Sequence, residues 1–565
     1  MRFRERIPEF LSGFAVIVVV CVLAGHAYGA PPSGDAVRQE IESVPMLLSP
    51  TPDAPLSVDL PYRGPMEVKN GQKIKVSRIV LRGNTVFGST PLGALVSSCE
   101  GREVSLAELN EAANRITAYY QNAGYYFARA YVPAQEIKDG VVQIDVLEGY
   151  LGEIFINGNE KYTDCYVLRH LCQLRKEGAI RYPTLERSLL LLNDNLGLKS
   201  KAVLKAGKEL GTTDLYLELA ESDSLLKGYF DYNNFGSRYS SQHRFGFQLE
   251  FGNLTKHGDV LSLRGVVGSP IDQLFYGKVN YALPVGCYGT KAGASFTAMR
   301  YEVGKEFKIL DMSGETNIYS FYVTHPLIRS QGRNLVVEGA FDHKSVRNYV
   351  FSDFKTGDDT LSVFKVGANY DELRWGGRNY VSGYLHQGVP DFLGSLDSRD
   401  PESSRGASGA GGDFTKLTLD LGHLRKIKDF AYLLVRAGAQ VTSDDLVIAE
   451  QFSIGGPDSV RGYPMSEYQG DKGYTLSAEL RVPVFQNRWK DRVQVVGFLD
   501  YGEASLLTPL VGEDGKTCLF GGGLGLRLSL PWETNVRVDL GFPLNDYEPS
   551  TGDSATWYFQ VVKFF

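Results

Sequence analysis

The chain has 565 residues, a formal net charge of −7 and 22% charged residues. This charge argues against a dedicated nucleic-acid-binding protein, because such proteins carry an excess of Lys and Arg. Beyond residue 29, no apolar run reaches the roughly 20 residues that a membrane-spanning helix needs. The histidines and cysteines show no spacing typical of a metal site or a catalytic centre, so we expect no metal, no cofactor and no enzymatic activity.

The N-terminus has the pattern of a secretory signal peptide. Three arginines precede an apolar run of 11 residues, 14–24, and small residues follow at Ala27 and Gly29. We therefore expect residues 1–29 to be removed during export. An uncleaved membrane anchor is the alternative, but the apolar run is short for one. The signal carries three arginines and two glutamates (+1), so its removal changes the formal charge from −7 to −8.

Residues 30–73 join the signal to the first folded domain. A helix is predicted for residues 33–48, although a helix of this length is marginal by itself. Six prolines lie between positions 45 and 65, and prolines at this density favour an extended linker.

An internal repeat follows in residues 74–222. The stretch IVLRGN at 79–84 is echoed by IFINGN at 154–159, and each has the pattern of a strand that ends in a Gly-Asn turn. Two helices and two strands follow in each copy, which predicts two small α+β domains, 74–149 and 150–222. The predicted helices span residues 90–98, 105–123, 164–175 and 183–196, and the predicted strands span 126–133, 141–147, 201–206 and 213–219. Ser105 and Glu108 form a capping-box pattern at the start of the second helix.

Five cysteines follow the signal, and an odd number cannot form a complete disulfide framework. They are Cys99, Cys165, Cys172, Cys287 and Cys518. Cys165 and Cys172 fall in one predicted helix, about 10 Å apart, which is too far for a bridge. We interpret the cysteines as small buried apolar residues.

From residue 223 onward, short segments alternate apolar and polar residues. In 476–484 the polar positions include Ser477, Glu479 and Arg481, and residues 524–530 and 536–540 follow the same period. Each such strand has one apolar and one polar face. Charges on the polar face, frequent glycines and the export signal favour an outer-membrane barrel over a soluble β domain. At about 20 residues per strand and turn, residues 223–565 predict an all-β transmembrane barrel of about 16 antiparallel strands.

Two motifs lie within the predicted barrel. The first motif is in a long connection predicted at residues 449–473, and the second is in a predicted strand. A separate long surface loop is predicted at 394–412. The lumen-loop motif is Val460, Arg461, Gly462 and Tyr463, and its expected partner motif is Phe498, Asp500 and Gly502. A lumen-facing charge needs a partner, so we expect Arg461 to pair with Asp500. Gly462 is expected to adopt a backbone conformation that other residues resist, and Tyr463 to pack.

Two tandem α+β domains before a barrel that contains Val460 to Tyr463 resemble the two-partner secretion transporters. These are the hemolysin/adhesin activation-secretion proteins of the POTRA-plus-barrel outer-membrane superfamily. Residues 124–133 are similar to the first POTRA domain of that family. The chain end is similar to the signal that the barrel-assembly machinery reads, at Trp557, Phe559, Val561 and Phe565. Lys563 departs from the pattern, because an apolar residue is usual there.

The resemblance implies a translocator in the outer membrane, with its POTRA domains in the periplasm. They would bind the N-terminal secretion segment of an unfolded exoprotein by adding a strand to a sheet edge. The exoprotein would cross the barrel lumen, where the loop with Arg461 shapes or gates the pore and helix 33–48 plugs it at rest. The implied partners are this exoprotein, outer-membrane lipid and the barrel-assembly machinery, with no nucleic acid.

Two other outer-membrane functions compete with this one. An insertase of the same superfamily, which assembles other outer-membrane proteins, typically carries more than two POTRA domains. A passive porin has no need of the repeat in residues 74–222.

Overall fold

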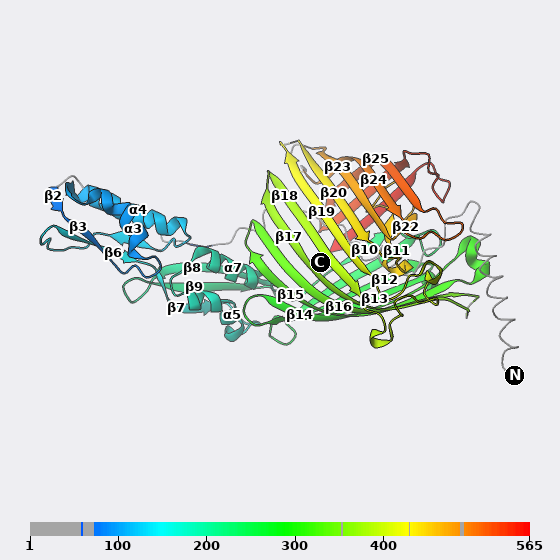
Figure 1. Cartoon of the computed structure of the whole chain (residues 1–565), viewed down its shortest axis with the longest axis horizontal. Coiled ribbons are helices and arrows are strands. Elements are labelled where there is room, and N and C mark those ends of the chain that lie inside the picture. The colour runs from blue at the N-terminus through cyan, green and yellow to red at the C-terminus, as the bar shows by residue number, and fades with distance from the viewer. Residues whose placement is uncertain (1–57, 60–72, 352–353, 429, 486–490) are drawn as a thin grey trace.

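The computed structural model describes residues 58–59 and 73–565, apart from 352–353, 429 and 486–490. Two small α+β units lie at one end of the molecule and a closed β-barrel at the other (Figure 1). The expected signal peptide and the expected helix at 33–48 lie outside the described residues. Within the described part, no helix is both long and apolar enough to cross a membrane.

The first unit, residues 73–147, packs helices on a three-stranded sheet. β3 (Arg78–Arg82) runs parallel to β6 (Val141–Leu147), and β5 (Arg129–Tyr131) runs antiparallel to β6 on the other side. α3 (Ser89–Val96) and α4 (Leu106–Asn122) contribute to one apolar core with this sheet. The unit also contains β2 (Lys73–Val76), η1 (Ser97–Cys99) and β4 (Arg102–Ser105). The β2–β4 pair was not predicted from the sequence.

The alternation of β6 and the N-terminal cap of α4 explain how this unit folds. Val142, Ile144 and Val146 are buried in the core that also holds the apolar face of α4. At the start of α4, the Glu108 backbone N–H donates to Ser105 Oγ at 3.2 Å, and the Ser105 backbone N–H donates to Glu108 Oε2 at 2.7 Å. The predicted capping box is therefore confirmed.

The second unit, residues 150–221, has a sheet of order β1-β8-β9-β7. Its strands are β1 (Val58–Asp59), β7 (Tyr150–Asn157), β8 (Leu198–Ala206) and β9 (Thr212–Glu221), and its helices are α5 (Asp164–His170), α6 (Cys172–Glu177) and α7 (Tyr182–Asn193). β1, which precedes the first unit in the chain, pairs in parallel with β8 and forms one edge of the sheet. The single helix predicted at 164–175 is wrong: the backbone leaves helical geometry at Leu171 (φ −93°, ψ 6°), which separates α5 from α6.

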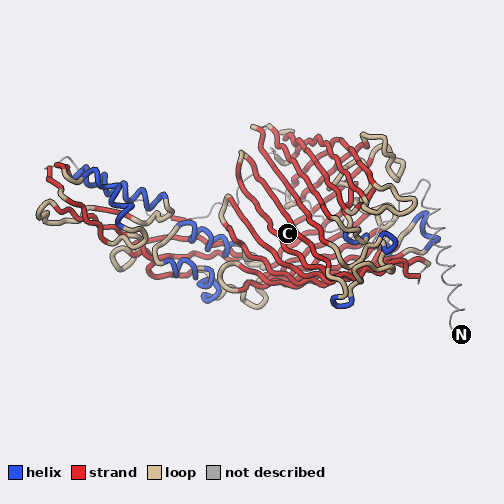
Figure 2. The backbone as a smooth tube through the Cα atoms, in the orientation of Figure 1, coloured by secondary structure: helices blue, strands red, loops and turns tan. Residues whose placement is uncertain are grey.

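Sixteen antiparallel strands close the barrel, as the strand period predicted. The strands are β10 (Leu226–Asn233), β11 (His243–Gly252), β12 (Val260–Ser269), β13 (Leu274–Val285), β14 (Thr290–Glu302), β15 (Ser313–Arg329), β16 (Arg333–Val350), β17 (Phe354–Arg374), β18 (Gly377–Gly388), β19 (Thr415–Ile427), β20 (Ala431–Thr442), β23 (Lys472–Pro483), β24 (Val493–Ser505), β25 (Lys516–Leu530), β26 (Thr534–Pro543) and β27 (Thr556–Phe564). The barrel closes where β10 pairs with β27. Figure 2 shows strands filling the barrel wall, with longer loops at the end away from the two units.

The two faces of the wall differ as the alternation requires. On β24, Leu499 is 55% exposed on the outer face, whereas its neighbour Asp500 is 1% exposed on the lumen side. On β23, Leu480 is exposed outside and Glu479 is buried inside. An apolar outer band around a polar interior is the arrangement that a lipid bilayer requires of a barrel.

The four predicted assembly-signal residues lie on one face of β27 or just beyond it. Trp557, Phe559 and Val561 are spaced by two, opposite the buried Tyr558, and Trp557 is exposed on the outer wall. Phe565 stacks on Phe230 of β10 with ring centroids 5.3 Å apart. Lys563 Nζ donates a hydrogen bond to the carbonyl oxygen of Trp532.

Glu148 joins the two α+β units. It lies between β6 and β7 and is 1% exposed. Its carboxylate accepts hydrogen bonds from the backbone N–H groups of Thr85 and Val86, both at 2.8 Å, and from the hydroxyls of Tyr120 at 2.6 Å and Tyr150 at 2.8 Å. Burial opposes ionisation, but the hydrogen bond from the Thr85 hydroxyl foremost, followed by that from Tyr120, holds the pKa of Glu148 below its usual range. The carboxylate thus ties the first unit to the first residue of β7.

Glu148→Gln is expected to destabilise an isolated fragment of residues 74–222 by about 2 kcal/mol, because a charged acceptor of several hydrogen bonds is lost. Since the folded-state pKa is lowered, this contribution is fully present above the unfolded value of about 4.3 and is lost as the pH falls through the folded pKa. Urea unfolding from pH 7 downward measures both effects. Glu103→Gln, at an exposed position of β4, is the control. An equal loss in this control, or a Glu148→Gln deficit independent of pH, would contradict the assignment.

Candidate functional site

The connection between β20 and β23 carries the Arg461 motif to lumen-facing side chains. Residues 443–471, here called the lumenal loop, contain η6 (Ile448–Glu450) and a short hairpin of β21 (Phe452–Ile454) with β22 (Tyr468–Gly470). The Arg461 motif lies in the segment of chain that connects β21 to β22. The sequence had predicted a long connection over 449–473, and the observed connection starts six residues earlier, at 443.

Arg461 is fully buried and forms a bidentate ion pair with Asp500 of β24, as predicted. Its Nε donates to Asp500 Oδ2 at 2.6 Å and its Nη2 to Oδ1 at 3.0 Å. Its Nη1 also donates to Glu479 Oε2 at 2.8 Å and lies 3.6 Å from Asp539 Oδ2. The guanidinium carbon stands 3.5 Å from the ring centroid of Phe498. The planar guanidinium of arginine can donate to two carboxylates and stack on a ring at the same time, and the ammonium group of lysine cannot.

A second layer of charges surrounds this pair. Arg527 of β25 bridges Glu479 at 3.1 Å and Asp539 at 2.6 Å. Arg537 of β26 bridges Asp539 at 2.7 Å and Asp458 of the lumenal loop at 2.8 Å. The ion pairs of this network join four cations, Arg461, Arg481, Arg527 and Arg537, to four anions, Asp458, Glu479, Asp500 and Asp539. These pairings offset the cost of removing the charges from water. The complete set is called the lumenal latch.

The other motif residues fit the lumenal loop closely against the wall. Gly462 has a φ of +107°, and a Cβ there would lie 2.6 Å from the carbonyl carbon of Phe542, so both backbone conformation and space require glycine. Val460 packs on Gly502, where a Cβ would lie 2.7 Å from Val460 Cγ2. Tyr463 is buried, and its hydroxyl donates to the carbonyl oxygen of Phe520 at 3.3 Å.

Sequence reasoning did not assign Glu479, Asp539, Arg527 and Arg537 to the site. A usable signal was present, because all four lie at polar positions of segments that alternate like strands. Alternation places them on the lumen side, but it does not reveal which strands face the lumenal loop. That information comes from the barrel order, in which β23 to β26 are consecutive neighbours.

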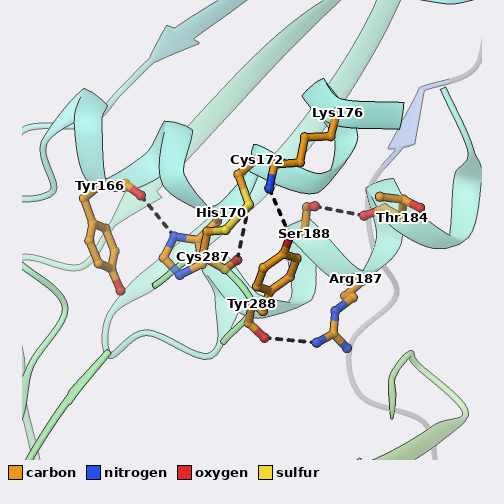
Figure 3. Close-up of a disulfide and its surroundings, with 9 residues drawn as sticks. All are labelled: Tyr166, His170, Cys172, Lys176, Thr184, Arg187, Ser188, Cys287 and Tyr288. Atoms are coloured by element: carbon orange, nitrogen blue, oxygen red, sulfur yellow. Dashed lines mark hydrogen bonds between the residues drawn. A yellow bond between two sulfur atoms is a disulfide. The ribbon is translucent and has the colours of Figure 1, made fainter. Parts of the chain in front are cut away.

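A second site of interest is the joint between the second unit and the barrel. Cys172 of α6 forms a disulfide with Cys287 in the turn between β13 and β14 (Figure 3). The two Cα atoms are 6.3 Å apart and the residues are 115 positions apart in the chain. The interpretation of all five cysteines as buried apolar residues was therefore wrong for this pair. It was also wrong for Cys165 and Cys518, which are exposed free thiols, whereas Cys99 is buried. Separation in sequence concealed the pairing.

Polar contacts extend this joint on both sides of the disulfide. Arg187 Nη2 donates to the carbonyl oxygens of Tyr288 at 3.0 Å and Pro326 at 2.5 Å. Asp194, just after α7, forms an ion pair with Arg329 of β15 at 2.6 Å. Lys176 Nζ donates to the Tyr288 hydroxyl at 3.2 Å (Figure 3). The second unit is thus attached to the β13–β14 turn and to the end of β15.

The fold and the latch together define a class of protein. Two α+β units of the POTRA type precede a closed 16-strand barrel, which places the barrel in the outer membrane and the POTRA units in the periplasm. A family model described as "Haemolysin secretion/activation protein ShlB/FhaC/HecB" matches residues 211–528, and the model "POTRA domain, ShlB-type" matches residues 74–149. The chain belongs to this family of two-partner secretion transporters, whose members are transporters and not enzymes.

Individual relatives agree with this assignment. The heme/hemopexin transporter protein HuxB of Haemophilus influenzae is 26% identical over 595 aligned residues, which cover 100% of both chains. The solved structure of CdiB from Escherichia coli matches with a TM-score of 0.74 at 21% identity, covering 98% of each chain. CdiB from Acinetobacter baumannii matches with a TM-score of 0.64 at 17% identity, over 90% of this chain and 95% of that one. At these identities the two structures support the fold alone.

The disulfide predicts a defined pattern of thiol labelling. A maleimide-polyethylene glycol reagent should add two more labels to the denatured protein after reduction than before it, because Cys172 and Cys287 become available. In detergent, the double variant Cys172→Ser/Cys287→Ser should be cleaved faster by protease near the joint, since a long-range crosslink worth about 2–4 kcal/mol is lost. Cys165→Ser, which removes an exposed free thiol of the same unit, is the control. Equal labelling before and after reduction would show that the pair is not bonded.

Proposed function

We propose that the chain exports one unfolded exoprotein, that its POTRA units recognise the N-terminal segment of this exoprotein, and that the lumenal loop shapes the pore through Arg461. The observation that carries the proposal is the lumenal latch: a loop fastened by a fully buried arginine to one sector of the barrel wall. A loop held inside the lumen sets the space available to a passing chain, so its position bears directly on transport.

Open space beside the latch supports this arrangement. A cavity of about 440 Å³ lies along the inner wall of strands β11 to β17, and most of the residues that line it have polar side chains. The lining includes Arg264, Lys278, Asn280, Glu338 and Lys365. The latch occupies strands β23 to β26, so the part of the loop that carries Arg461 and this cavity use different sectors of the lumen. A hydrated polar wall suits an unfolded chain, because it provides hydrogen-bond partners for the exposed backbone.

The edge of the second unit supports recognition by strand addition. β8, a strand of nine residues, lies next to the edge of the sheet, where the two-residue strand β1 pairs with it in parallel at Ala202 and Val203. An edge that accepts one strand of this chain has the geometry to accept an extended segment of another. The export function is favoured over an insertase by family membership and by the two α+β units, since an insertase typically carries more.

Arg461→Ala is expected to reduce secretion at least about tenfold while the barrel still inserts. The substitution leaves Asp500 without its bidentate partner, at a cost of roughly 3–5 kcal/mol for a buried pair. Asp500→Ala should be milder, because Arg461 keeps Glu479 and Asp539. The double variant should be no worse than Arg461→Ala alone. Secretion of the exoprotein and heat-modifiable gel mobility are the measurements.

Two further variants sharpen this test. Arg461→Lys should secrete as poorly as Arg461→Ala, because a single ammonium group cannot donate to both carboxylates in the geometry of a guanidinium. Arg399→Ala, at an exposed position of the neighbouring loop 389–414, is the matched control and should secrete normally. Additive losses from Arg461→Ala and Asp500→Ala would show that the two residues do not act as one latch.

Strand addition predicts a defined crosslinking site for the exoprotein. A photoreactive amino acid at Lys205, an exposed position of β8, should crosslink the secretion segment roughly fivefold more than one at Arg175, an exposed position of α6. The experiment uses the full transporter in detergent with the purified N-terminal segment. Equal crosslinking from both positions, when the segment binds, would place recognition elsewhere in the protein.

A further inference from the structure

We propose that Glu450 is a positioning residue that fixes the base of the lumenal loop to the barrel wall, on strands that the lumenal latch does not touch. The proposal rests on the proposed function, because it concerns the same loop. It assigns a role to a group of buried charges outside the Val-Arg-Gly-Tyr motif, formed by Glu450 with Lys344 of β16 and Lys416 of β19.

These three side chains form a compact buried ion cluster. Lys344 Nζ lies 2.6 Å from Glu450 Oε1, and Lys416 Nζ lies 2.8 Å from Glu450 Oε2. Glu450 is 1% exposed, and both lysines are also buried. A buried carboxylate is costly unless cations compensate it, so the geometry of these contacts determines where residue 450 can lie.

Hydrogen bonds to the backbone fix the same point. Lys416 Nζ donates to the Glu450 carbonyl oxygen at 2.7 Å, and Gln440 Nε2 donates to that oxygen at 2.9 Å. Gln440 also donates to the carbonyl oxygen of Asp471 at 2.9 Å, so one amide joins the start and the end of the lumenal loop. The Asp471 carboxylate accepts from the Leu446 backbone N–H at 3.0 Å. The two ends of the lumenal loop are therefore held together at its base.

Apolar packing accompanies the ion cluster. Leu446, Val447 and Ala449, just before Glu450, share a buried core with residues of β16, β17 and the loop 389–414. Among those residues are Val346, Leu361, Leu396 and Phe414. The charged contact stands at the border of this core, where it sets the direction in which the chain continues toward Arg461.

The base and the tip of the loop are consequently held by different strands. The tip contacts β23, β24 and β26 through Arg461, and the base contacts β16, β19 and β20 through Glu450. In the barrel order, the strands that hold the tip come after β20, and the strands that hold the base come before it or are β20 itself. Loss of one anchor leaves the other in place, so each can be tested separately.

Hydrogen–deuterium exchange of the full-length transporter in detergent tests the assignment. Glu450→Gln should speed exchange about tenfold in peptides covering residues 443–452, with little change in peptides covering 458–465, because local opening depends on local contacts. Arg461→Ala should give the reverse pattern. Glu503→Gln removes a different barrel ion pair, with Lys516 at 2.8 Å, and is the matched control. Unchanged exchange at 443–452, or faster exchange throughout the barrel strands, overturns the proposal.

A charge-compensated variant separates positioning from simple stability. Glu450→Gln combined with Lys344→Gln restores the net charge of the three-residue cluster, and it should insert with normal heat-modifiable mobility. Exchange at 443–452 should remain fast and secretion should remain reduced several-fold. Recovery of slow exchange in this double variant would mean that only the charge balance mattered, and would overturn the proposal. If Arg461→Ala secretes normally, the proposed function fails, while the exchange data still decide whether Glu450 holds the base.

Discussion

The requirement that a buried guanidinium be compensated organises the lumen of this protein. Arg461 has no exposed surface, and water cannot stabilise its charge. The barrel meets this requirement with carboxylates on three strands, Glu479 on β23, Asp500 on β24 and Asp539 on β26. Those carboxylates are in turn compensated by Arg527 and Arg537, and Arg537 also contacts Asp458 in the loop. The position of the loop therefore depends on the charged side chains of this sector of the wall, and those side chains depend on the loop for their compensation.

Much of this arrangement was accessible from the sequence, because two local signals were strong. Alternation marked the barrel strands and their polar faces, and glycines around Arg461 marked a loop that approaches other backbone closely. The pairing of Arg461 with Asp500 was expected because a lumen-facing charge needs a partner and because Phe498, Asp500 and Gly502 resemble the strand motif that receives the loop arginine in the family. The single helix at 164–175 was predicted wrongly, because helical periodicity is continuous through Leu171 while the backbone is not.

Other features depend on relations that no local pattern contains. The disulfide between Cys172 and Cys287 joins segments whose proximity arises only once the second unit docks on the barrel turns. The roles of Glu479 and Asp539 depend on which strands neighbour β24, and this is a property of barrel order. The short pair β2–β4 has only four residues per strand, too few for a clear period. In each case the missing information was tertiary.

The pairing of β1 with β8 limits how the first unit can turn relative to the second. This unit is connected to the second at both of its ends, through β1 on one side and through β7 on the other. The first unit is therefore held to the second by two connections and not by one. The two residues between β6 and β7, Glu148 and Gly149, form the shorter connection and keep the first unit beside the second. A secretion segment that adds to this side of the sheet, as proposed, must pair beyond Val203 or displace β1, so β1 competes with the segment for the same backbone groups.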